Sequence, residues 1–530
     1  MTLKKILGII YYIKALKHRG RKTYGGVAME YLVCLGIYLL IMIGISVYSN
    51  KKTKNVSDYA LGGRRIPPWM SAFSYGTAYF SAVLLIGHAG KNGWSYGLGS
   101  FLIVAGNSFL GTYLAWKVLG GKTREMTQRL GANTMPQFLG IRYRDEKIRL
   151  LTAAIIFVFL VPYASSVYKG LGALFEITFG LKESYIMLFM TVVTAIYLFT
   201  GGFLAASIAD FIQGIIMIVG VVLLIIYIIT NPQVGGVAQG ISRLEGIDSD
   251  LIRPLTTDTA LPLLSLVIMT SLGTWGLPQM ISRFYTIKDE KSIPVAKVVS
   301  TIFALIITTG AYIMGSFSRL IIETNNGAPA IMKDGVLTSI TYDQIVPHVL
   351  SRTLPTIVLA IILIVILAAS MSTLSSIVLA SSTTFVMDLL KPLYKEKLNE
   401  KRTMIALRLC GFVFVVFSYL LAIGNSPILS LNALSWGVVS GCLFAPYVLG
   451  LYYKRITKKG VYAGILSAIL IMVFGVIKFG INSAMITTVS AAAIILPNIV
   501  VLGVSLVTEK LEQTHITYIF TKNETEATIE

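Results

Sequence analysis

The sequence predicts an all-α integral membrane protein with about thirteen transmembrane helices. Hydrophobic residues make up 55% of the 530 residues and charged residues only 13%, whereas soluble domains carry roughly a quarter charged residues. Apolar runs long enough to cross a bilayer recur along the whole chain. The three cysteines all lie inside such runs, so neither a disulfide framework nor a zinc site is predicted. The sequence contains no hydrolase or nucleotide-binding motif, and we do not expect an enzyme.

The predicted crossings follow one another with short connections. Seven lie near 31–48, 70–90, 94–118, 149–176, 184–202, 204–229 and 260–283. Six more lie near 297–321, 356–387, 404–424, 428–452, 461–478 and 484–507. An odd number of crossings places the two ends of the helical bundle on opposite sides of the membrane.

Basic residues mark one side of the membrane. They cluster in the loops at 51–65, 122–149, 288–291, 391–402 and 454–459. Because cytoplasmic loops retain positive charge, we expect a multi-pass cell-membrane protein whose first helix begins outside and whose carboxyl terminus is cytoplasmic. The net charge of +20 then reflects orientation and attraction to anionic membrane lipid. No nucleic-acid partner is expected.

The amino-terminal segment 1–28 breaks this pattern. It carries seven basic residues and no acidic one, yet it would lie outside. Met29 stands directly before the first apolar run, so we expect residues 1–28 to reflect a misassigned upstream start. A basic helix on the membrane surface and a signal peptide are the alternatives.

The crossings between 70 and 452 divide into two groups of five, 70–229 and 260–452, joined by an extracellular loop at 230–259. An odd number per group means that the second copy enters the membrane from the opposite side, as in an inverted repeat. A leading helix and cytoplasmic loop precede the repeats. Two trailing helices and a cytoplasmic tail follow them. These flanking parts span 29–69, 453–507 and 508–530.

The first helix of each group contains a segment that can interrupt it. Residues 76–82 read Gly-Thr-Ala-Tyr-Phe-Ser-Ala, and residues 273–279 read Gly-Thr-Trp-Gly-Leu-Pro-Gln. Glycine and proline favour a break, and a broken helix exposes backbone carbonyls to ions and half-helix ends to a solute. The alternative is that the proline only kinks a packed helix.

The helix near 356–387 carries a dense row of small hydroxyl residues. Ala369, Ser372, Thr373 and Ser376 are spaced i, i+3, i+4, i+7, so they share one face. Oxygen ligands suit a hard cation such as sodium. Alternatively, these hydroxyls allow close helix packing and bond their own backbone carbonyls.

Two charged residues lie inside predicted crossings. Asp210 follows the start of the run 204–229, and a carboxylate within the membrane usually faces a partner or an ion path. Lys169 lies in the run 149–176. It either faces a binding site or extends its amine to the membrane interface.

At these residues the sequence resembles the sodium:solute symporter family, which includes proline, pantothenate, sialic acid and sodium/glucose symporters. The resemblance covers nearly the whole chain from about residue 30, with motifs at 58–64, 201–213, 368–376 and 446–464. It implies a leucine-transporter-like five-plus-five inverted repeat. It also implies a sodium-coupled symporter that imports a small polar solute, such as an amino acid or carboxylate, by alternating access. We expect the chain to function as a monomer.

The resemblance also implies the site residues. A main sodium site would use the carbonyls of Thr77, Phe80 and Ala369 with the hydroxyls of Ser372 and Thr373. A second sodium ion would be bound by Asp210, Ser372, Ser375 and Ser376. The solute pocket would be lined by Thr77, Tyr79, Ser81, Lys169, Thr274 and Trp275. No metal other than sodium is expected.

Departures from the family limit the choice of solute. Tyr79 stands where the proline branch has an essential aspartate, and Val83-Leu84 stands where the sugar branch has a Glu-Gln pair. Thr274 stands at the position of a gating tyrosine, which leaves Trp275 as the stacking candidate. Neither a proline nor a sugar assignment therefore transfers. A proton-coupled symporter that uses Asp210, and less favourably a channel, are the alternative functions.

Overall fold

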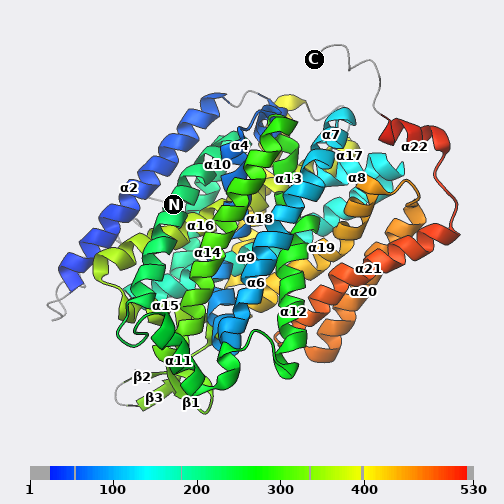
Figure 1. The fold of residues 1–530 in the computed structure, drawn as a ribbon. Helices are drawn as coiled ribbons and strands as arrows, with labels where there is room; N and C mark the ends of the chain where they lie inside the picture. The colour runs from blue at the N-terminus through cyan, green and yellow to red at the C-terminus, as the bar shows by residue number, and fades with distance from the viewer. Residues whose placement is uncertain (1–23, 53–54, 181, 334–335, 395–398, 522–530) are drawn as a thin grey trace.

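The computed structural model describes residues 24–52, 55–180, 182–333, 336–394 and 399–521. These residues form a bundle of helices with one small sheet (Figure 1). The nine longer helices are α2 (Tyr24–Lys52), α9 (Glu146–Phe179), α10 (Glu183–Ile229), α14 (Ile293–Phe317), α16 (Thr356–Thr384), α18 (Glu400–Ala422), α19 (Ile428–Tyr452), α20 (Lys458–Phe479) and α21 (Ile486–Val507). Of the basic segment 1–28, residues 1–23 lie outside the described part of the chain.

Shorter helices complete the bundle. They are α3 (Val56–Leu61), α4 (Pro68–Tyr79), α5 (Trp94–Tyr96), α6 (Phe101–Ala105), α7 (Gly121–Arg129), α8 (Met135–Tyr143), α11 (Val237–Ile247), α12 (Thr257–Ser271), α13 (Pro278–Thr286), α15 (Tyr342–Thr353), α17 (Lys391–Tyr394) and α22 (Gln513–Phe520). Segments of π-helix occur at Val83–Gly93, Gly106–Leu114, Trp116–Gly120 and Phe385–Leu390.

Within the described residues, ten helices are long and apolar enough to cross a membrane. Two shorter apolar helical stretches, Val33–Ser49 and Glu183–Ala195, accompany them. Helix α10 contains a break at Gly202, whose φ of 60° and ψ of −162° are not helical and suit glycine. This break separates the predicted crossings 184–202 and 204–229. All thirteen predicted crossings fall on helical segments, and the number thirteen stays a prediction.

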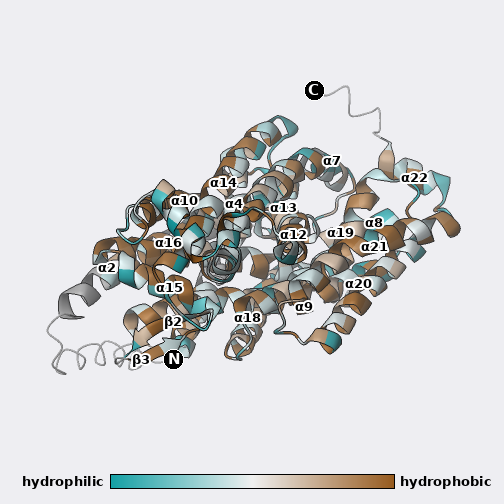
Figure 2. Ribbon diagram, turned by 60° about the horizontal axis from the view of Figure 1, so that its bottom comes forward, coloured by the Kyte–Doolittle hydropathy of each residue, from teal (hydrophilic) through white to brown (hydrophobic). Residues whose placement is uncertain are grey.

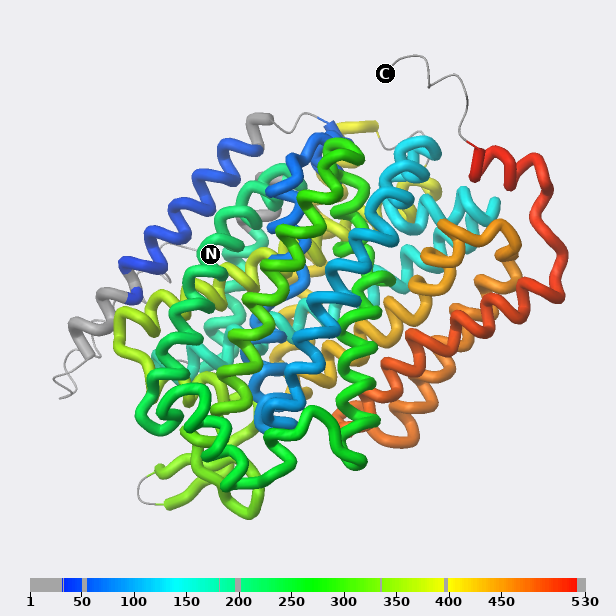
Figure 3. Tube along the Cα trace, viewed as in Figure 1, coloured from blue at the N-terminus to red at the C-terminus, as the bar shows by residue number. Residues whose placement is uncertain are grey.

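The outer helices present apolar side chains on the surface. Leu40 of α2, Leu409 of α18, Leu466 of α20 and Ile499 of α21 are all exposed. Figure 2 shows hydrophobic residues predominating along the helices. Helix α2 and the pair α20 and α21 lie on opposite flanks of the bundle (Figure 3). Such surfaces suit lipid and not water.

The two ends of the bundle differ. Helices α7, α8, α17 and α22 lie at one end, here called the basic end, and α11, α15 and the sheet lie at the other, here called the sheet end (Figure 1). Helix α22 lies at the basic end, where Arg129 donates to the carbonyl of Ile519. The assignment of the basic end to the cytoplasm stays a prediction.

The sheet at the sheet end is an addition to the predicted all-α fold. Strands β1 (Glu323–Asn325), β2 (Ala328–Lys333) and β3 (Val336–Ser339) pair antiparallel in the order β1-β2-β3. Asn326 and Gly327 connect β1 to β2 with φ values of 48° and 80°. Asn-Gly is the preferred pair for a two-residue hairpin turn with positive φ, so the sequence did contain a signal for this hairpin.

Both helices predicted to break are interrupted at the predicted positions. Helix α4 ends at Tyr79, Phe80 is extended, and the chain resumes as a π-helix at Val83. Helix α12 gives way to a 3₁₀ segment (Leu272–Gly276), Leu277 is extended, and α13 begins at Pro278. Proline is well suited to the first helical position. It therefore starts a new helix here and does not merely kink a continuous one.

Candidate ion and solute site

The break after α4 brings a free carbonyl against the hydroxyl face of α16. The hydroxyls of Ser372 and Thr373 each donate to the carbonyl oxygen of Thr77 at 3.0 Å. Ser372 also donates to the carbonyl of Ala369 at 2.9 Å. A carbonyl in the last turn of a helix has no partner within the helix, so the end of α4 at Tyr79 makes the Thr77 carbonyl available to α16.

This cluster matches the chemistry predicted for the main sodium site. Four of its five predicted residues, Thr77, Ala369, Ser372 and Thr373, meet in the interior, where each is at most 1% exposed. The fifth, Phe80, is the extended residue after α4, and its ring stacks on Tyr79 at 4.2 Å. Carbonyl and hydroxyl oxygens are the ligands that hard cations prefer. The residues present therefore fit a sodium ion.

The residues predicted for the second sodium ion also lie near one another, with an additional basic residue among them. A carboxylate oxygen of Asp210 lies 3.2 Å from the guanidinium Nη2 of Arg283, and both side chains are buried. Arg283 also donates to the hydroxyl of Ser376. Ser375 and Ser376 donate to the carbonyl of Ser372 at 2.8 and 2.9 Å. The sequence analysis missed Arg283, although an arginine at the end of the predicted crossing 260–283 was visible.

The predicted pocket residues at the two breaks, other than Thr77, direct their polar atoms at the protein. The hydroxyl of Tyr79 donates to the carbonyl of Thr270 at 2.5 Å, and the indole nitrogen of Trp275 donates to the carbonyl of Leu110 at 3.0 Å. Thr274 donates to the carbonyl of Ser271 at 2.8 Å. The hydroxyl of Ser81 accepts from the backbone nitrogen of Val83 at 3.1 Å. These side chains therefore help to fix the shape of the two breaks.

Lys169 has acidic neighbours. It is half-buried on α9 and close enough to Asp343 and Glu183 to act on both electrostatically. Burial raises the pKa of Asp343, and the nearby Lys169 and Lys91 oppose that shift. Asp343 also accepts a hydrogen bond from the backbone nitrogen of Ile428 at 3.1 Å. Lys169 thus interacts with one acidic group of α15 and one of α10.

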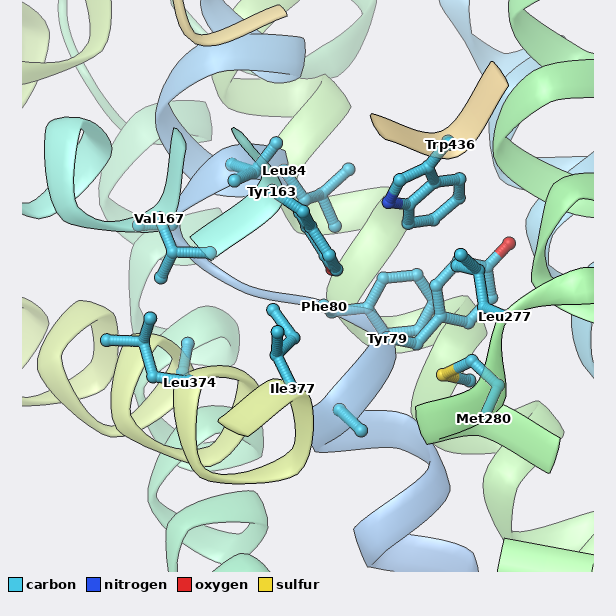
Figure 4. Packing of buried hydrophobic residues seen from close by; sticks show 14 of the residues in the cluster. Tyr79, Phe80, Leu84, Tyr163, Val167, Leu277, Met280, Leu374, Ile377 and Trp436 are labelled. Atoms are coloured by element: carbon cyan, nitrogen blue, oxygen red, sulfur yellow. The ribbon is translucent and has the colours of Figure 1, made fainter. Parts of the chain in front are cut away.

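Two further residues at the breaks were missed by the sequence analysis. Trp436 of α19 lies 6.4 Å from Tyr79 and meets Tyr163 edge-on at 5.5 Å, measured between ring centroids (Figure 4). The indole nitrogen of Trp436 and both amide atoms of Gln279 are buried and have no hydrogen-bond partner within the described residues. Buried polar atoms are nearly always paired, so unpaired ones beside a helix break are candidates to bind a solute.

Gln279 directly follows Pro278 in the predicted break motif, and this position was the available signal. Trp436 lies in a continuous apolar helix, so nothing in its local sequence distinguished it from a packing residue.

A family model described as the sodium:solute symporter family matches residues 59–468. The osmoregulated proline transporter OpuE of Bacillus subtilis is 30% identical over 443 residues, covering 83% of this chain and 87% of that protein. A sodium/proline symporter of Staphylococcus aureus is 30% identical over 450 residues, covering 83% of this chain and 85% of that protein.

Two solved structures share the fold. A Na+-coupled sialic acid symporter in a substrate-bound outward-open state has a TM-score of 0.72 and 19% identity, covering 91% of this chain and 99% of that chain. Mhp1, a nucleobase-cation-symport-1 family transporter in a closed conformation, has a TM-score of 0.52 and 12% identity, covering 88% and 99%. These likenesses confirm the predicted leucine-transporter-like fold class.

Proposed function

Since the chain belongs to the sodium:solute symporter family, we propose that it is a secondary active transporter that imports a small polar solute together with sodium by alternating access. The solute would be an amino acid, a carboxylate or a related compound. The basic end would face the cytoplasm, because its loops carry the positive charge that cytoplasmic loops retain. The protein would act as a monomer in the cell membrane.

The observation that carries this proposal is the convergence of two α16 hydroxyls on one carbonyl of the broken helix. Ser372 and Thr373 both reach the carbonyl of Thr77 at 3.0 Å. A sodium ion held by these oxygens, with the carbonyls of Phe80 and Ala369, would attach the broken helix to α16. Ion binding would thereby favour one arrangement of the two repeats, and this differential affinity is what coupling requires.

The solute is proposed to lie between the two breaks, beside Trp436 and Gln279. Tyr79, Phe80 and Trp436 offer aromatic faces, and the unpaired indole and amide groups offer neutral hydrogen-bonding atoms. This combination suits a small solute that has both an apolar body and polar groups. Amino acids, including the proline named for the two relatives, are therefore the first compounds to test, although Tyr79 replaces the aspartate of the proline branch.

Uptake by purified protein in proteoliposomes tests the function. We expect saturable solute uptake that requires an inward sodium gradient and that is absent from protein-free liposomes. A panel of amino acids, carboxylates and sugars, first screened by thermal shift with and without sodium, would identify the solute. Uptake driven by a proton gradient without sodium would favour the proton-coupled alternative. Flux that does not saturate would favour a channel.

A further inference from the structure

The ion pair between Asp210 and Arg283 links three elements of the interior. Asp210 comes from the part of α10 after Gly202, Arg283 from α13, and Ser376 from α16. Asp210 is 0% exposed and Arg283 1% exposed. The guanidinium also lies 4.8 Å from the centre of the Phe203 ring. The charge of Arg283 is therefore held inside the bundle at the place where the family resemblance predicts a second sodium ion.

Arg283 uses groups that the second ion would need. Its Nη2 contacts one carboxylate oxygen of Asp210 and the hydroxyl of Ser376, and both residues belong to the predicted ion site. The other carboxylate oxygen of Asp210 has no hydrogen-bond partner within the described residues. The site is therefore already partly occupied by a positively charged side chain of the protein.

Asp210 is the acidic residue of the predicted second ion site, whose other members are serines, so these residues neutralise one cation. Asp210 supplies one negative charge, and the guanidinium balances it. A sodium ion added beside an intact pair would leave an uncompensated positive charge in a buried environment, which is strongly unfavourable. Removing the guanidinium from the carboxylate restores the negative charge that an ion requires.

We propose that Arg283 and a second sodium ion compete for Asp210, so that the ion binds only after α13 has released the carboxylate. This inference rests on the proposed sodium coupling and adds a residue to it. Arg283 lies five residues after Pro278, the first residue of α13. Occupancy of the second ion site is therefore linked to the packing of the half-helix after the second break, and Arg283 acts as a positioning residue.

Sodium-dependent thermal stability of the purified protein tests the competition without measuring transport. The measurements use the Thr373→Ala background. Thr373 belongs only to the predicted main site, so its loss weakens that site and leaves every residue of the second ion site in place. Sodium is exchanged for potassium at constant ionic strength. We expect Arg283→Gln to lower the sodium concentration for half-maximal stabilisation by about 5- to 150-fold, the usual range of coupling between two ligands. Arg283→Lys keeps the positive charge, so it should lower the sodium concentration for half-maximal stabilisation much less.

Two controls define the effect. Arg149→Gln removes an arginine from another buried carboxylate, Asp388, which lies 2.9 Å away in the structure, and should leave the sodium response unchanged. Asp210→Asn in the Arg283→Gln protein removes the shared carboxylate and should abolish the gain. If Arg283→Gln is poorly folded in potassium, sodium should rescue its folding, because the ion replaces the missing charge.

Several outcomes would overturn the proposal. They are an unchanged or weaker sodium response in Arg283→Gln, failure of sodium to rescue an Arg283→Gln protein that is poorly folded in potassium, and the same gain in Arg149→Gln. Failure of the competition proposal can be distinguished from failure of the proposed function by measurements on the wild-type protein. Sodium-driven solute uptake by the wild type tests the function, whereas only the Arg283 variants test the competition.

Discussion

Removal of either hydroxyl that meets the Thr77 carbonyl should weaken sodium binding at the main site. Each hydroxyl lies 3.0 Å from that carbonyl, and each would replace one water of the ion's hydration shell. Loss of one such oxygen is comparable to loss of a hydrogen bond to a charged group, about 1.5–3 kcal/mol. Ser372→Ala and Thr373→Ala should therefore raise the sodium concentration for half-maximal uptake roughly 10- to 150-fold.

The assay is sodium-dependent solute uptake in proteoliposomes, with maximal rate and half-saturating sodium fitted separately. Ser370→Ala is the matched control, because Ser370 is equally buried on α16 but donates to the carbonyl of Ile366 in its own helix. Thr373→Ser keeps the hydroxyl and should stay close to wild type. Unchanged sodium affinity in both Ser372→Ala and Thr373→Ala, or an equal loss in Ser370→Ala, would refute the site and leave the hydroxyl row as packing.

Three further predictions concern the solute and the second ion. Lys169→Ala should weaken uptake of an acidic solute far more than uptake of a neutral analogue; an equal loss for both would make Lys169 a structural partner of Asp343. Asp210→Asn, made together with Arg283→Gln so that no buried guanidinium is left unpaired, should shift the reversal potential from two sodium ions per solute towards one. A wild-type ratio of one would contradict this. Trp436→Phe keeps an aromatic ring but removes the indole N–H. It should raise the half-saturating solute concentration about 2- to 13-fold without changing that for sodium, and an unaltered solute affinity would remove Trp436 from the pocket.

The features that the sequence predicted best were local ones. Apolar runs predicted the helices, and Pro278 predicted the second break because proline removes a backbone donor. The spacing of Ser372 and Thr373 placed both on one face of α16, and the family resemblance identified Thr77 as their partner.

The features that the sequence did not predict depend on contacts between distant residues, or on a turn in a loop between crossings. Arg283 meets Asp210 only after the chain has folded, 73 residues apart in sequence. Trp436 becomes distinctive only when α19 packs beside the first break. The hairpin at Asn326-Gly327 joins two short strands in a connection between membrane crossings, where the apolar runs that predicted the helices give no signal.

The hydroxyl groups of α16 bear on how this helix enters the bilayer during synthesis. Ser370 bonds the carbonyl of Ile366, and Ser375 and Ser376 bond the carbonyl of Ser372, all within the same helix. An unsatisfied polar group in hydrocarbon costs several kcal/mol, and these internal bonds remove that cost for Ser370, Ser375 and Ser376 before any neighbouring helix is present. These three hydroxyls therefore add little to the cost of inserting α16, whereas Thr373 finds its acceptor only when α4 is in place. The oxygen-lined site is then completed when α4 packs against it.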